Sequence, residues 1–514
     1  MEEQLDLPKQ EKQILNQSIF YSFSLYLRMF FKLIGGIVVA KLLGPAAYGL
    51  KNAFDLAVDY QTYSDFGTFE AIQIHAPYHR GANDANQAER IMTTAFGVNM
   101  LLALTAGGIL ILASFYLRTT AWDTPYVDFL LFLGLIVITN KLKLFYLNKL
   151  KLDKKIYLLS QAEMLYGIAA TILGIVLTYY YGLRGLFISL FLSDVIYLGY
   201  ILAVEKKLPP MMISFPLFWK LMKVGLSINI VFFLITLLES VDRLVIITML
   251  SEESLGFFGI ATVAIGVVFT VPMAVESVTL PRLMEKLGKT QDINRIKNFL
   301  VDPTILMAYF LPFLLAALYF GIHLPIDYYL TQYAPSVNVV KILTLSLFFT
   351  ATYTMPVSVC FGLNKQLNIT GIIIPVILLN LLLNYVFIRI GWNIDGVAYG
   401  TGISYFVFSS VMIWYTLKQF QAKFKEVFNL LLLIYCPFCY LLVLTITLDH
   451  LWYATTTNLW NDLLTTAVRF VIFSILYSLI FILIRKHEAV TKLIENLPIS
   501  EVFQEKLRMR FSQK

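Results

Sequence analysis

Long apolar segments recur along almost the whole of this 514-residue chain, and they constrain its fold more than any other feature. An α-helix rises about 1.5 Å per residue, so about 20 apolar residues cross the roughly 30 Å hydrocarbon core of a bilayer. Hydrophobic residues make up 58% of the chain and charged residues only 14%, a composition that a soluble domain could not bury. The sequence therefore predicts an all-α polytopic membrane protein with fourteen spans, at 18–42, 48–72, 91–116, 126–147, 157–180, 184–204, 219–249, 255–280, 299–322, 337–361, 367–389, 394–417, 427–448 and 464–485.

Lysine and arginine are unequally divided between the two ends of these spans. The segments that follow even-numbered spans are basic, as at 141–155, whereas the segments at 251–256 and 321–335, after odd-numbered spans, hold neither residue. The positive-inside rule then places both termini in the cytoplasm. The cytoplasmic segments expected on this basis are the N-terminus 1–17, a linker 205–218 and a basic tail 486–514.

The two halves of the chain resemble each other. KLLGPAAYGLKNAF, after the first span, aligns with TMLSEESLGFFGIA, near the end of the seventh, and places Gly49 on Gly256. A second match at a similar offset pairs 158–189 with 366–404. A resemblance that merely reflects apolar composition stays open. A true repeat of six spans predicts parallel halves with the substrate site between them. The expected domains are six-helix bundles at 18–204 and 219–417, followed by two extra helices within 418–485.

Two basic residues lie near the middle of a predicted membrane span, where a charged side chain is most costly. Arg28 and Lys32 are one turn apart near the middle of the first span and share one helix face. On insertion scales each costs about 2.5–3.5 kcal/mol at a helix centre, and no acid in that span offsets them. Arginine and lysine both bind phosphate well. We therefore expect Arg28, Lys32 and Lys51 of the second span to bind the pyrophosphate of a substrate; ion pairing with the second-span aspartates is the structural alternative.

A second group of polar residues is a candidate for ion coupling. Glu239 and Asp242 in the seventh span, with Asn380 and Asn384 in the eleventh, offer oxygen ligands for Na⁺ or surroundings for a proton carrier. Two structural alternatives stay open. Glu239 and Arg243 are spaced to pair along a helix, and asparagines often hydrogen-bond between helices. The sequence predicts no metal centre, no other cofactor and no nucleic-acid partner.

Two segments carry a resemblance to a known family. Residues 40–81 contain an L-G-x-x-x-Y-G turn and a D-x-G segment, and residues 242–283 contain D-R, an L-G-x-x-G turn and a following proline. Together with the span count and the charged first span, they resemble the Wzx-type polysaccharide flippases. These belong to the polysaccharide transporter branch of the multidrug/oligosaccharidyl-lipid/polysaccharide exporter superfamily.

The resemblance implies a MATE- and lipid-flippase-like fold, with a V-shaped pair of bundles around a cationic cavity. The expected function is alternating-access transfer of an undecaprenyl-pyrophosphate-linked oligosaccharide from the cytoplasmic to the outer leaflet of the bacterial inner membrane. First-span basic residues bind the pyrophosphate in related flippases, and Arg28 and Lys32 match that placement. Na⁺ or H⁺ coupling is known in the superfamily, and Glu239, Asn380 and Asn384 match it loosely. Expected partners are the lipid-linked oligosaccharide, the bilayer and the polysaccharide polymerase machinery.

Two rival functions remain. A cation-coupled drug or metabolite antiporter of the same superfamily would need an acid-rich cavity, against which Arg28 and Lys32 argue. An enzyme of the same pathway would need catalytic residues in a long outer loop, and the loops between the predicted spans are short. The sequence therefore favours a flippase over an enzyme.

Overall fold

The structure is a computed structural model that describes residues 7–82, 84–120, 124–207, 210–290, 296–452 and 458–481. Within these ranges, twelve helices are long and apolar enough to cross a membrane, which confirms the predicted all-α polytopic fold. The predicted tail 486–514 and residues 1–6 lie outside the described residues. The cytoplasmic placement of both termini therefore stays a prediction.

Two helices are much longer than one crossing and are kinked at glycine. Helix α1 (Leu7–Thr62) contains Gly44 at φ 75° and ψ 169°, and α5 (Ile156–Glu205) contains Gly182 at φ 57° and ψ −139°. A side chain would clash with the backbone at such angles, so glycine is required there. Each helix therefore forms two segments of spanning length. Dividing these two helices turns the twelve candidate spans of the described residues into fourteen segments. The predicted seventh span, 219–249, is wrong as one helix, because a turn at Glu239 and Ser240 separates Phe215–Leu238 from Val241–Met249.

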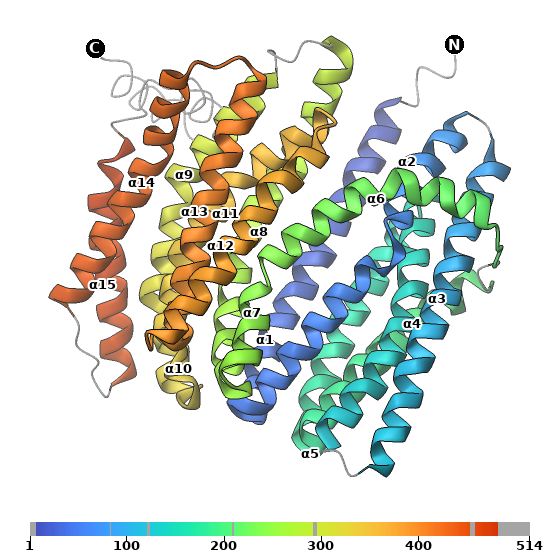
Figure 1. Cartoon of the computed structure of the whole chain (residues 1–514), viewed down its shortest axis with the longest axis horizontal. Coiled ribbons are helices and arrows are strands. Elements are labelled where there is room, and N and C mark those ends of the chain that lie inside the picture. The colour runs from blue at the N-terminus through green and yellow to red at the C-terminus, as the bar shows by residue number, and fades with distance from the viewer. Residues whose placement is uncertain are drawn as a thin grey trace. The chain divides into compact units, whose positions relative to one another are not determined.

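The remaining elements follow in chain order, coloured from blue to red in Figure 1. They are α2 (Thr68–Gly81), α3 (Ala85–Thr119), α4 (Thr124–Leu152), α6 (Phe215–Leu238), α7 (Val241–Met249), α8 (Glu252–Thr290), α9 (Lys297–Gly321), α10 (His323–Tyr328), α11 (Ser336–Gly362), α12 (Gln366–Arg389), α13 (Asn393–Gln419), α14 (Phe424–Leu451) and α15 (Leu459–Ser478), with 3-10 turns η1 (Tyr63–Asp65) and η3 (Thr331–Tyr333).

The predicted second span, 48–72, is wrong at its end. The helix stops at Thr62, η1 follows, and α2 starts only at Thr68. The Asp65 carboxylate accepts hydrogen bonds from the backbone N–H groups of Gly67 (3.4 Å) and Phe69 (3.1 Å). It thereby satisfies donors at the start of α2 that have no partner within the helix. The D-x-G segment is thus a helix break with its own cap.

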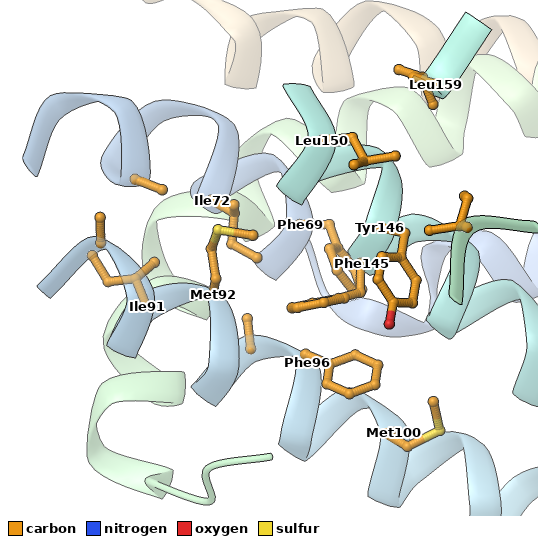
Figure 2. Close-up of a cluster of buried hydrophobic side chains, with 14 of the residues drawn as sticks. Phe69, Ile72, Ile91, Met92, Phe96, Met100, Phe145, Tyr146, Leu150 and Leu159 are labelled. Carbon is orange, nitrogen blue, oxygen red and sulfur yellow. The ribbon is translucent and has the colours of Figure 1, made fainter. Parts of the chain in front are cut away.

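The chain forms two compact units. Unit 1 is Met1–Thr236 with Ser251–Gly256, and unit 2 is Leu237–Leu250 with Phe257–Lys514. The bundle boundaries inferred from the repeat, 18–204 and 219–417, stay a prediction. Within unit 1, buried side chains of α2 to α5 form an apolar core (Figure 2), including Phe69, Phe96, Phe145 and Leu159. This core fixes α4 and α5, the helices that face the first-span cations.

Small residues allow the first segment of α1 to approach α5 closely. A Cβ added to Gly167 would lie 2.9 Å from the Cα of Arg28, so only glycine fits there. One turn further on, the Thr171 hydroxyl donates a hydrogen bond of 3.0 Å to the backbone carbonyl of Phe31. Close packing over small residues is the usual way in which helices associate in a membrane. It places Arg28 against α5.

The glycines that the repeat aligns lie in one reciprocal contact within unit 1. A Cβ added to Gly49 would lie 1.8 Å from the carbonyl oxygen of Glu252, and one added to Gly256 would lie 1.9 Å from that of Pro45. Each glycine therefore packs on the residue four positions before its counterpart. The side chain of Asn52 adds a hydrogen bond of 3.4 Å to the Leu255 carbonyl.

Unit 2 carries the two additional helices of the chain. Both α14 and α15 contact α9 (Figure 1). Asp449 of α14 lies 2.6 Å from the Nζ of Lys341 on α11 and 3.6 Å from a guanidinium nitrogen of Arg469 on α15. One carboxylate therefore joins three helices through two largely buried cations.

Candidate functional site

Arg28 is held on α1 by a partner that the sequence did not predict. Its Nη1 donates a short hydrogen bond to Oε2 of Glu163 on α5, and its Cζ lies 4.7 Å from the ring centre of Tyr166. The expectation that Arg28 lacks a counter-ion, or pairs with an aspartate of the second span, was therefore wrong. Its side chain is still 39% exposed, against 8% for that of Glu163. The acid lies behind the cation, which stays accessible.

Lys32 differs from Arg28 in having no close counter-ion. It is exposed, and no salt bridge joins it to another residue in the described part of the chain. Its charge interacts over longer distances with Asp55 and Asp59, and also with Arg28 and Lys51. The structure thus places the three predicted cations in one region of unit 1 and leaves Lys32 the most open of them.

Lys51 pairs within its own helix. Its Nζ lies 2.6 Å from Oδ2 of Asp55, one turn further along the second segment of α1, and 5.1 Å from the ring centre of Tyr48. Its side chain is 17% exposed. Lys51 is therefore less available to a ligand than Arg28 or Lys32.

The candidate ion-coupling residues lie on helices of unit 2 that contact one another. Helix α7 carries Asp242 and contacts both α12, which carries Asn380 and Asn384, and α13. All three side chains are at most 3% exposed. The Thr401 hydroxyl of α13 lies 3.5 Å from Oδ2 of Asp242. The buried part of this unit where these three helices contact one another thus contains carboxylate, amide and hydroxyl oxygens.

One amide oxygen of the asparagine pair has no donor. The Nδ2 of Asn384 donates to Oδ1 of Asn380 at 2.7 Å, while Oδ1 of Asn384 is buried without a hydrogen-bond partner. Exchanging oxygen and nitrogen in both amides would reverse this bond and leave the other oxygen without a donor. The oxygen has room because the neighbouring residue is Gly400, whose added Cβ would lie 2.3 Å away. A buried oxygen without a donor is suited to a cation.

Glu239 forms its hydrogen bond with a residue outside this group. Helices α6 and α7 are separated by a turn at Glu239 and Ser240, which removes the regular spacing that an ion pair with Arg243 requires. The predicted Glu239–Arg243 salt bridge is therefore not formed. Oε1 of Glu239 instead accepts a hydrogen bond of 2.9 Å from the hydroxyl of Tyr353 on α11.

Several contacts at these sites could not be predicted from the sequence. Tyr166, Thr401 and Tyr353 lie far along the chain from the residues that they contact, and nothing local marks them. Glu163 is visible in the sequence as an acid inside the predicted fifth span, but its pairing with Arg28 is not. Lys143 belongs to the basic segment 141–155 in the sequence, although it also lies within the predicted fourth span. Its apolar surroundings, in TNKLKLFYLN, were the one available indication of a buried lysine.

Comparisons with known proteins agree with this architecture. A profile of the family described as "Polysaccharide biosynthesis protein" matches residues 38–296, half of the chain. A search of curated proteins found no match to this chain.

Solved structures share the fold at low sequence identity. A multidrug resistance MATE family transporter of the MOP superfamily, in an inward-facing conformation, matches with a TM-score of 0.62 and 16% identity, covering 78% of this chain and 95% of its own. The lipid II flippase MurJ, in an inward closed conformation, matches with a TM-score of 0.65 and 15% identity, covering 89% and 98%. A MOP superfamily transporter from Pyrococcus furiosus gives 0.57 and 17%, covering 80% and 95%. These matches confirm the predicted MATE- and lipid-flippase-like fold.

Proposed function

Because the chain belongs to the family of polysaccharide biosynthesis proteins, we propose that it is a flippase for a lipid-linked oligosaccharide. The substrate is an undecaprenyl-pyrophosphate-linked repeat unit, which moves from the cytoplasmic to the outer leaflet of the bacterial inner membrane by alternating access. The protein supplies no chemical step; it binds the headgroup and exchanges the side from which the site is open. Its partners are the substrate, the bilayer and the polymerase machinery that uses the product.

The observation that carries this proposal is the accessible positive charge inside a membrane-spanning helix. Arg28 keeps 39% of its side chain exposed despite its pairing with Glu163, and Lys32 is exposed without a salt bridge in the described residues. Ionisable groups at membrane depth almost always face a bundle interior or a water-filled cavity. A guanidinium and an ammonium one turn apart fit the two phosphoryl groups of a diphosphate.

The proposal is tested by removing both cations in cells. In a strain without its own copy of the gene, the R28A/K32A double variant is expected to restore no surface polysaccharide while it still accumulates in the membrane. Lys41, which is exposed further along the same helix, provides the matched control K41A and is expected to restore wild-type amounts. Normal polysaccharide from the double variant would refute the role of these cations.

The coupling ion is assigned to unit 2. We place it among Asp242, Asn380, Asn384 and Thr401, because these side chains combine a buried carboxylate with an amide oxygen that has no donor. Hard cations prefer such oxygen ligands. Glu239 accepts a hydrogen bond from Tyr353 and is a further carboxyl group near Asp242. Transport by the D242N variant is expected to lose its dependence on Na⁺ or on pH, whichever drives the wild type.

The antiporter alternative rests on the fold shared with a multidrug transporter and on the acids beside the cations. Asp55 and Asp59 contribute negative charge near Lys32, as an organic cation would require. Accumulation of a fluorescent cation such as ethidium separates the two functions. An antiporter lowers it in cells that express the protein, whereas a flippase leaves it unchanged.

A further inference from the structure

Unit 1 contains another half-buried cation next to Arg28 that the proposed function has not used. Lys143 of α4 lies with its Nζ 4.4 Å from the ring centre of Tyr166, the same ring that Arg28 approaches to 4.7 Å. The two cationic groups are therefore at most 9.1 Å apart. An aromatic face attracts a cation, and two cations beside one ring repel each other.

Each of these cations is balanced by a carboxylate of α5. Lys143 lies 2.6 Å from Oδ1 of Asp194, whose other oxygen accepts a hydrogen bond of 2.8 Å from the Thr139 hydroxyl. Glu163 holds Arg28 in the same way. The side chains of the acids are 8% and 4% exposed, whereas those of Arg28 and Lys143 are 39% and 20% exposed. In each pair the cation is therefore more accessible than its acid.

We infer that Arg28, Lys143 and the ring of Tyr166 form a binding site for a diphosphate, here called the two-cation clamp. The carboxylates of Glu163 and Asp194 compete with the diphosphate for these two cations. This inference rests on the proposed function and adds residues to its headgroup site. In the ligand-free protein the acids neutralise the cations and limit their mutual repulsion. When a diphosphate binds beside Lys32, its phosphate oxygens also replace the carboxylates as partners of Arg28 and Lys143. The long side chains can turn toward the ligand while the backbone of α1, α4 and α5 stays packed.

The competition has a consequence that a purely structural salt bridge lacks. A cation can bind the diphosphate only while it is not paired with its carboxylate. The apparent affinity for the diphosphate is then the intrinsic affinity multiplied by the fraction of time in which the cation is unpaired. Glutamine in place of Glu163 keeps a carbonyl oxygen that can accept from Arg28 but removes the negative charge. The E163Q variant should therefore bind the diphosphate more tightly than the wild type.

The experiment measures binding of undecaprenyl pyrophosphate to the purified full-length protein in nanodiscs, with undecaprenyl monophosphate as the second probe. We expect K143M to weaken binding of the pyrophosphate about tenfold or more, as loss of a charge-assisted hydrogen bond does. It should also reduce the preference for the pyrophosphate over the monophosphate. We expect E163Q to tighten binding about threefold to tenfold. A destabilised protein cannot account for tighter binding, so E163Q stays informative if K143M folds poorly.

Glu205 gives a matched control on the same helix. Its side chain is 7% exposed and lies 2.6 Å from the Nζ of Lys155, but no contact joins it to the Tyr166 ring among the described residues. The E205Q variant should bind both probes like the wild type. Wild-type affinity in both K143M and E163Q, with weaker binding in R28M, overturns the clamp and leaves the proposed function standing. Failure of the wild type to bind undecaprenyl pyrophosphate, or unchanged binding in the double variant R28M/K32M, refutes the proposed function and the clamp with it.

Discussion

Replacing Gly400 by alanine is expected to disturb the candidate ion site through a single contact. The added Cβ would lie 2.3 Å from Oδ1 of Asn384, which is 1.1 Å closer than the shortest ordinary contact of 3.4 Å. Asn384 is fully buried and bonded to Asn380, so it can move only by breaking that bond. Overpacking a buried site costs about 1–3 kcal/mol, and the lost hydrogen bond about 0.5–1.5 kcal/mol. Alanine regains up to about 1 kcal/mol through its higher helix propensity. We therefore expect G400A to lower the free energy of unfolding by about 1–4 kcal/mol.

A double-mutant cycle isolates this contact from other effects of the substitution. In an N384A background the clashing oxygen is absent, and the second substitution should cost little, since alanine favours a helix over glycine by up to about 1 kcal/mol. The assay is equilibrium unfolding of the purified protein in mixed micelles. The control is G371A on α12, where an added Cβ meets nothing within 4 Å. Additive losses in the cycle, or a G400A variant as stable as G371A, would refute the reasoning.

The G400A substitution should also weaken the coupling of transport to its ion. G400A moves the amide oxygen that has no donor, so the dependence of transport on Na⁺ or on pH should weaken in the variant that still folds. N384A removes this oxygen directly and should reproduce the loss of coupling without the full loss of stability. If G400A transports with the same ion dependence as the wild type, the buried oxygen of Asn384 is not an ion ligand.

Three further outcomes are expected. G49V should prevent accumulation of folded protein, because even a Cβ would lie 1.8 Å from the Glu252 carbonyl, whereas G36A, with open space around it, should accumulate normally; immunoblots of membranes compare them. D449A should lower the free energy of unfolding by about 3–5 kcal/mol, because it removes the carboxylate shared by two largely buried cations; unfolding in mixed micelles measures it. K151C, in a cysteine-free background, should react with an impermeant thiol reagent only after cells are permeabilised, and labelling of intact cells would reverse the predicted orientation.

The sequence predicted the spans well because a bilayer imposes a length and an apolar composition on each crossing segment. It located the breaks near Gly44 and Gly182, where the apolar runs are separated by turn residues. It extended the second span too far, past Asp65, because the cap that this side chain forms depends on backbone geometry. Hydropathy alone does not distinguish a continuous polar helix from two helices joined at a turn.

The candidate sites were predicted less completely. Arg28 and Lys32 were found because their charge is out of place in an apolar run, and that physical anomaly is local. The residues that surround these cations come from distant parts of the sequence. Glu163 lies 135 positions from Arg28, and Thr401 lies 159 positions from Asp242. No spacing rule connects such pairs before the helices are packed.

By itself the sequence determined that this chain crosses the membrane many times and carries cations in its first span, because the solvation of apolar and charged groups depends on composition along one helix. Only the tertiary structure decided which charges are neutralised and which remain open. Arg28 has an acid from α5, Lys51 has one from its own helix, and Lys32 has no salt bridge among the described residues. The physical reason is that an ion pair depends on a few ångströms between side chains, and helix packing sets that distance.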